Sequence, residues 1–184
     1  MNTTSDDSHY SVPGALRDGT PVTIRLMRPD DKDKLVAAFA KLDQQSVYTR
    51  FFSFRKELPE GPLSRIDRID FVRLAALVAT LGSGAAETII GSATYVADTA
   101  PAGARVAEVA FMIEEDYQGQ GLAGRLLAAL AGIARRHGID RLVAEVLAGN
   151  AAMIAVFRRS GLPMRKRSEG GVVHIELDLG PEPA

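Results

Sequence analysis

Apolar and polar residues alternate along several short runs of the chain, which is the pattern of β-strands with one buried face. Glycine-containing segments at 82–86 and 98–104 separate three of these runs and are typical of hairpin turns. A further hairpin is predicted around Gly170 and Gly171. Seven strands are predicted, at residues 22–27, 74–81, 88–97, 105–113, 141–147, 164–168 and 172–179.

Apolar residues spaced three or four positions apart predict helices elsewhere. Asp30 or Asp31 is suited to capping the first helix, and Asn150 to capping the last. The longest helix ends at Gly138, after basic side chains that favour a helix C-terminus. About four helices are predicted, at residues 30–42, 46–52, 122–137 and 150–160, with a loop and a short helix at 53–71.

The order of these elements decides the fold class. Three strands linked by hairpins come first, and one strand–helix–strand crossover then joins 105–113 to 141–147. A doubly wound parallel sheet would need repeated crossovers. We therefore predict an α+β fold with a mixed, mostly antiparallel sheet. Its domain is expected at 21–180, after a polar and flexible segment at 1–20.

Three glycines precede the longest helix, in the stretch YQGQGLAGRLL at 117–127, and spell the dinucleotide-binding pattern G-x-G-x-x-G. That interpretation needs a strand that runs straight into the first glycine and an acidic residue at the end of the next strand. Here EEDYQ separates Ile113 from the glycines, and the later acid, Glu145, lies inside an apolar strand. We therefore reject a dinucleotide site.

The glycines still leave backbone N–H groups uncovered at the N-terminus of a long helix, where the helix dipole is positive. Such an end suits a pyrophosphate. A mobile loop before an amphipathic helix is the alternative. The strand, spacer, glycine loop and helix occur together here, and this combination favours anion binding.

The stretch QGQGLA at 118–123 resembles the acyl-CoA signature Q/R-x-x-G-x-G/A of the GNAT N-acetyltransferase superfamily. A second signature of that superfamily resembles LVAEVLAGNAAMIAVFRRSGL at 142–162. The resemblance covers about residues 21–179. It implies the GNAT fold, acetyl-CoA as co-substrate, and an acyl-CoA site at the crossover.

The resemblance also assigns roles to residues. The backbone of Phe111, Met112 and Ile113 would pair with the pantetheine arm. The pyrophosphate would be held by the loop residues Gln118, Gly119, Gln120, Gly121, Leu122, Ala123 and Gly124. Asn150 would contact the pantetheine or the ribose, although a plain helix cap fits that position equally well. The 3′-phosphate would meet Arg125, Arg158 or Arg159, unless these are only solvated helix charges.

Catalysis requires a neutral amine. A lysine with a pKa of about 10.4 is neutral in only about one molecule in 10³ near pH 7, so a general base is needed. Glu108 is the candidate because it is the one charge in VAEVAFMI, facing the same way as Ala110 and Met112, and a carboxylate in apolar surroundings is a better base. A structural ion pair is the alternative for Glu108. Glu145 is the rival base.

Phe157 departs from the superfamily pattern. The superfamily often has a tyrosine there as the acid for the leaving thiolate, and phenylalanine donates no proton, so water is expected to serve. The chain has no cysteine, which excludes a cysteinyl intermediate and favours direct transfer.

Four segments resemble the bacterial protein-lysine acetyltransferases that modify acyl-CoA synthetases: PVTIRLMRPDD, SVYTRFF, AEVAF and LVAEVLAGNAAM. This implies a protein-lysine acceptor and favours Glu108 as the base. A small-molecule amine acetyltransferase and a non-catalytic acyl-CoA-binding sensor stay open as alternatives.

Composition limits the partners. With 22 basic and 23 acidic residues in 184, the net charge of −1 gives no case for nucleic acid or an anionic membrane. The polar N-terminus is no signal peptide and no apolar run is long enough to span a bilayer, so we expect a cytoplasmic protein. The three histidines match no zinc spacing, and no metal is expected. The oligomeric state stays open, a homodimer included.

Overall fold

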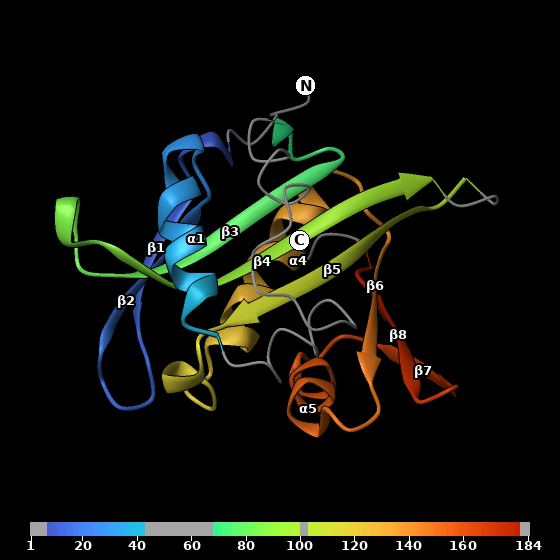
Figure 1. Ribbon diagram of the computed structural model, residues 1–184. Coiled ribbons are helices and arrows are strands. Elements are labelled where there is room, and N and C mark those ends of the chain that lie inside the picture. The colour runs from blue at the N-terminus through green and yellow to red at the C-terminus, as the bar shows by residue number, and fades with distance from the viewer. Residues whose placement is uncertain (1–6, 43–67, 100–102, 181–184) are drawn as a thin grey trace.

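An eight-stranded sheet dominates the computed structural model, which describes residues 7–42, 68–99 and 103–180 (Figure 1). The strand order is β1-β2-β3-β4-β5-β6-β8-β7. All neighbours are antiparallel except β5 and β6, which are parallel. The strands are β1 (Ser11–Ala15), β2 (Pro21–Leu26), β3 (Leu74–Leu81), β4 (Thr88–Thr99), β5 (Arg105–Ile113), β6 (Arg141–Leu147), β7 (Met164–Glu169) and β8 (Val172–Asp178). The predicted α+β class and its single crossover are confirmed.

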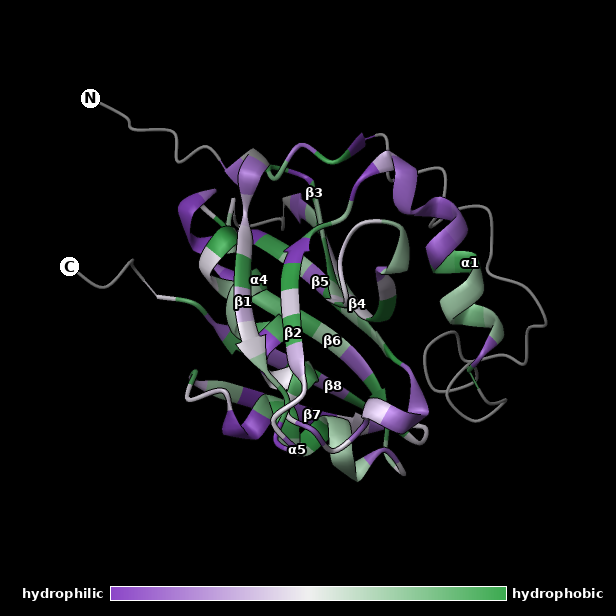
Figure 2. Ribbon diagram, turned by 90° about the vertical axis from the view of Figure 1, so that its left-hand side faces the viewer, coloured by the Kyte–Doolittle hydropathy of each residue, from purple (hydrophilic) through white to green (hydrophobic). Residues whose placement is uncertain are grey.

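Helices cover both faces of this sheet, and Figure 2 shows α1 on one side and α4 on the other. The α-helices of the described residues are α1 (Lys32–Ala40), α4 (Leu122–Arg136) and α5 (Ala151–Arg159). Short 3₁₀ helices are η1 (Asp7–His9), η2 (Pro29–Asp31), η4 (Gly84–Ala86) and η5 (Glu115–Tyr117). The helix predicted at 46–52, and most of the segment predicted at 53–71, lie outside the described residues.

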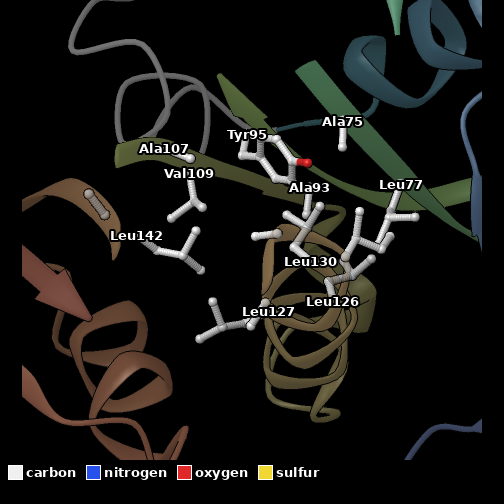
Figure 3. Close-up of a cluster of buried hydrophobic side chains, with 14 of the residues drawn as sticks. Ala75, Leu77, Ala93, Tyr95, Ala107, Val109, Leu126, Leu127, Leu130 and Leu142 are labelled. Atoms are coloured by element: carbon white, nitrogen blue, oxygen red, sulfur yellow. The ribbon is translucent and has the colours of Figure 1, made fainter. Parts of the chain in front are cut away.

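The main core lies between α4 and the sheet. Leu126, Leu127 and Leu130 project from α4 into one buried cluster with Tyr95 and Val109 of the sheet (Figure 3). These leucines recur at the three- and four-residue spacing that places side chains on one helix face. A smaller cluster on the opposite face includes Leu35, Phe39, Val78, Ile89 and Met112. Helices α4 and α1 therefore pack against opposite faces of the sheet where these two clusters lie.

Strand β1 extends the sheet to a point before the expected domain boundary at residue 21. The sequence of β1, SVPGA, does not have the alternating pattern of a strand. Pro13 and Gly14 are poor strand formers, and the first three residues are exposed. A proline is tolerated here because β1 is an edge strand. The rest of the predicted flexible segment, residues 1–6, lies outside the described part.

Candidate functional site

The parallel strands β5 and β6 separate partway along their length. They pair only where Val106–Glu108 faces Arg141–Val143. Strand β5 continues to pair with β4 up to Ile113, and β6 with β8 up to Leu147. Beyond Glu108 the edge of β5 that faces β6 therefore has no strand partner in the described chain. Its backbone N–H and C=O groups are open to an extended ligand that adds as a strand.

A cleft of about 820 Å³ opens where the strands separate. Its walls come from β5, β6, the loop before α4, the first turn of α4 and one face of α5. Most residues assigned to acyl-CoA from the sequence line it: Phe111, Met112, Ile113, Gln118, Gly119, Gly121, Leu122, Ala123, Gly124 and Asn150. Gln120 is not part of the lining, and its backbone oxygen accepts a hydrogen bond from the Arg17 amide at 3.3 Å.

The glycine loop has the geometry of an anion cradle. Gly119 and Gly121 have φ of +73° and +85°, which side chains with a Cβ rarely adopt. Gly121 is the N-cap of α4 and provides no side-chain cap, so the first amides of the helix remain available as donors. A Cβ built at Gly119 or Gly124 meets nothing within 4 Å, so there is space beside the loop. The Gln118 side chain donates to the Ile113 oxygen at 3.2 Å and closes the spacer back onto β5.

Arg17 is a cleft residue that the sequence did not reveal. Its Nη1 donates to the Gly119 oxygen at 2.8 Å, and its side chain lines the cleft. No local pattern could have found it, because it lies 102 positions from its partner in the chain. Of the arginines considered for the 3′-phosphate, Arg159 lines the cleft, whereas Arg125 lies against Gly14 and lines a separate hollow of about 360 Å³.

Glu108 is the last β5 residue paired with β6, and it is one of the residues that line the cleft. It lies on the opposite face of β5 from Ala107 and Val109, which are buried in the main core. The expectation of apolar surroundings is wrong for this residue, since Glu108 is exposed to solvent. No ion pair of Glu108 is found among the described residues, so the alternative of a structural ion pair has no support from them.

Glu145 lines the same cleft from β6 but has a partner. Its Oε1 lies 3.3 Å from His174 Nδ1, directly opposite on β8, and its side chain is 55% exposed. The His174 imidazole therefore occupies one side of the Glu145 carboxylate. The structure thus brings both candidate bases to the cleft, in different electrostatic settings.

Phe157 and Asn150 have structural roles at the wall made by α5. Phe157 is 1% exposed, and its ring meets that of Phe111 edge-on, with centroids 5.9 Å apart. The contact fixes α5 against β5. The Asn150 side chain accepts from the Met153 amide at 3.1 Å, so the predicted cap is confirmed. Its side-chain NH₂ group is the part that remains to face a ligand in the cleft.

No helix in residues 7–42, 68–99 and 103–180 is long and apolar enough to cross a membrane. The same residues contain no group of three or more histidine, aspartate or glutamate side chains suited to holding a metal ion.

Several known proteins are similar to this chain. The Acetyltransferase (GNAT) family matches residues 44–162. Acetyltransferase Pat of Mycolicibacterium smegmatis is 31% identical over 170 residues, covering 92% of this chain but only 49% of that relative. Acetyltransferase PA5475 of Pseudomonas aeruginosa is 30% identical over 139 residues, covering 76% of this chain and 73% of the relative.

A solved structure agrees with these matches. The GNAT domain of S. lividans PAT superimposes with a TM-score of 0.80 at 35% identity, covering 91% of this chain and 96% of that domain. The chain spans about half the length of the Mycolicibacterium relative and nearly the whole of the S. lividans domain. The chain therefore belongs to the acetyltransferase (GNAT) family, as its glycine loop indicated from the sequence.

Proposed function

We propose that the protein is an acetyl-CoA-dependent N-acetyltransferase that modifies a lysine side chain of a protein, with Glu108 as general base. Family membership supports the class of reaction, and both curated relatives are named acetyltransferases. The observation on which the proposal rests is that the unpaired edge of β5 leads into the glycine cradle within one cleft.

The residues of the cleft fit the chemistry of acetyl-CoA. The edge of β5 beyond Glu108 offers backbone donors and acceptors to an arm that contains amide groups. The loop from Gly119 to Gly124 offers backbone amides and a helix N-terminus to a diphosphate. The cleft volume of about 820 Å³ lies within the range of small-molecule sites.

Acetyl-CoA supplies an acetyl thioester that reacts with a neutral amine. Glu108 lies at the point where the strands separate, and its exposed carboxylate can accept the proton that the amine loses as the new N–C bond forms. A positioned base contributes about 10²–10⁴-fold to such a reaction. The proton for the leaving sulfur comes from water, because Phe157 has none to give.

A protein acceptor is supported by two observations. The exposed face around Glu108 continues onto Glu145 and His174, which are 55% and 36% exposed at their side chains, so a large partner can reach the base. The second is the similarity to the GNAT domain of S. lividans PAT and to Acetyltransferase Pat.

The test is a panel of acceptors read by mass spectrometry. Acyl-CoA synthetases, other lysine-bearing proteins and small amines are incubated with acetyl-CoA and the wild-type protein, Glu108→Gln or Glu145→Gln. We expect wild-type protein to acetylate a protein lysine, and Glu108→Gln to lose most of this activity. Acetylation of small amines alone would contradict the proposed protein-lysine acceptor. Acetyl-CoA binding with no transfer to any acceptor would favour a non-catalytic sensor.

A further inference from the structure

The turn between β1 and β2 is a rigid three-residue tip formed by Arg17, Asp18 and Gly19. The Leu16 amide donates to the Thr20 oxygen at 2.9 Å, and the Gly19 amide donates to the Leu16 oxygen at 3.0 Å. Asp18 Oδ1 accepts from the Thr20 amide at 2.9 Å, and Gly19 has a φ of +90°. A turn ending in a left-handed glycine is a common three-residue hairpin. Arg17 is thus presented from a fixed backbone.

This tip binds two consecutive carbonyls of the glycine loop. Arg17 donates from Nη1 to the Gly119 oxygen at 2.8 Å and from its own amide to the Gln120 oxygen at 3.3 Å. In a trans peptide the carbonyl of one residue and the N–H of the next point in opposite directions. Because both carbonyls face Arg17, the N–H groups of Gln120 and Gly121 point away from it.

The guanidinium of Arg17 also adds charge at the loop. It is an exposed side chain that lines the cleft, and it has further N–H donors beyond the one on Gly119. A guanidinium carries a positive charge, which favours an anion bound nearby at the loop. Arg125, the arginine that follows the glycine loop in sequence, lines the other hollow instead.

We propose that Arg17 is a positioning residue that holds the glycine loop with the N–H groups of Gln120 and Gly121 turned toward the diphosphate. The first hairpin then completes the acyl-CoA site from a part of the chain that precedes the family match at 44–162. This inference rests on the proposed use of acetyl-CoA. It adds to that proposal a residue that orients the amides at the diphosphate.

The experiment measures binding with three ligands that differ in their phosphates. Coenzyme A has a diphosphate and a 3′-phosphate, dephospho-coenzyme A has the diphosphate only, and S-acetylpantetheine has neither. Affinities for Arg17→Ala, Arg17→Lys and the wild-type protein are measured by calorimetry, or by NMR titration for the weakest ligand. Arg125→Ala is the matched control, since it removes an equal charge outside the cleft. Thermal unfolding verifies that each variant is folded.

We expect Arg17→Ala to weaken coenzyme A and dephospho-coenzyme A equally, by about 10- to 100-fold, and S-acetylpantetheine hardly at all. Arg17→Lys should fall between, and Arg125→Ala should match the wild type. A loss confined to coenzyme A would place Arg17 at the 3′-phosphate and overturn the assignment. An equal loss for all three ligands would mean that Arg17 only shapes the cleft. Wild-type protein that binds no coenzyme A would instead contradict the proposed function itself.

Discussion

Strands β2 and β5 each have a charged residue between apolar neighbours, Arg25 in β2 and Glu108 in β5, and the environments of these two residues are opposite. Arg25 is 3% exposed, and its guanidinium lies 2.7 Å from Asp31 and 2.6 Å from Glu87. Glu108 is exposed and lies where its strand loses a neighbour. A charged residue in an apolar strand therefore has a structural role where adjacent elements supply counter-charges. Its side chain remains accessible where the adjacent strand no longer pairs with its own.

The charges around Arg25 form a closed network. The hydrogen bond to Asp31 is the main reason that the pKa of Arg25 is raised. Hydrogen bonds from Arg25, and then from Lys34 at 2.8 Å, lower the pKa of Glu87 to about 2. The network ties β2 to the start of α1 and to the turn before β4. This network stabilises the fold, whereas we propose that the cleft binds the co-substrate.

The largest expected effect comes from breaking the buried network. Arg25→Met leaves Asp31 and Glu87 without their main partner and should lower the free energy of unfolding by about 3–5 kcal/mol. Arg141→Met is the control, because its pair with Glu176 is 34% and 44% exposed and should contribute at most about 1 kcal/mol. Urea denaturation measures both. A loss of unfolding free energy below about 1 kcal/mol in Arg25→Met would contradict the structural role given to Arg25 in the comparison with Glu108.

Acid should weaken the same network in a defined range. The folded-state pKa of Glu87 is about 2, below its usual 4.5, so its contribution to stability is present above about pH 4.5 and is lost as the pH falls toward 2. At 1.36 kcal/mol per pKa unit, the loss is at most about 3 kcal/mol. Denaturation of wild-type protein and Glu87→Gln between pH 7 and pH 2.5 measures it. Parallel stability curves for the two proteins would contradict the assignment.

Glycine-to-alanine changes in α4 should affect acetyl-CoA affinity at the cleft but not elsewhere on the helix. Gly124→Ala replaces a helical glycine and should raise stability by about 0.5–1 kcal/mol. Its Cβ would also enter open space at the lining of the cleft, so acetyl-CoA affinity should fall several-fold.

Gly132→Ala is the control for that change. It should stabilise the helix to a similar extent with no effect on binding, since its Cβ would meet only Arg136 Nη1, at an ordinary 3.5 Å. Thermal unfolding and calorimetry separate the two readouts. Equal acetyl-CoA affinities in Gly124→Ala and Gly132→Ala would mean that Gly124 does not lie at the binding surface. The left-handed Gly121 is less suitable for this test, since any side chain there strains the backbone.

The smallest effect is expected at Phe157. Phe157→Tyr keeps the aromatic contact with Phe111 and adds a hydroxyl beside the cleft, so stability should change by less than about 1 kcal/mol. Turnover should stay within a few-fold of the wild type if water already protonates the leaving sulfur. Steady-state kinetics tests this, and a large loss of turnover in a folded variant would show that packing at α5 limits the reaction.

The strands and helices that could be predicted from the sequence are those with strong patterns. The runs at 74–81, 105–113 and 141–147 coincide with β3, β5 and β6, since their burial alternates or is continuous. Asn150 and Gly138 marked helix ends through chemistry that acts within a few residues. Strand β1 was missed because its pairing with β2 is decided by the sheet and by no periodicity of its own.

The site was less predictable because its contacts are non-local. The glycine loop has a local signature, and it does line the cleft. Arg17 lies far in sequence from Gly119, and His174 lies on a different strand from its partner Glu145. No local sequence pattern predicts either contact. The exposure of Glu108 was also beyond sequence reasoning, since it depends on where β6 departs from β5.

The central claim is that Glu108 takes the proton from the acceptor amine, and a pH–rate profile tests it most directly. Transfer to a protein lysine is measured from pH 6.5 to 9.5 for wild-type protein, Glu108→Gln and Glu145→Gln, with acetyl-CoA affinity measured alongside. Glu108→Gln should keep its affinity and lose about 10²–10⁴-fold in turnover near pH 7. The deficit should shrink as the pH approaches the lysine pKa of about 10.4 and more amine is neutral. Near-normal turnover in Glu108→Gln at pH 7, or a larger loss in Glu145→Gln, would contradict the claim.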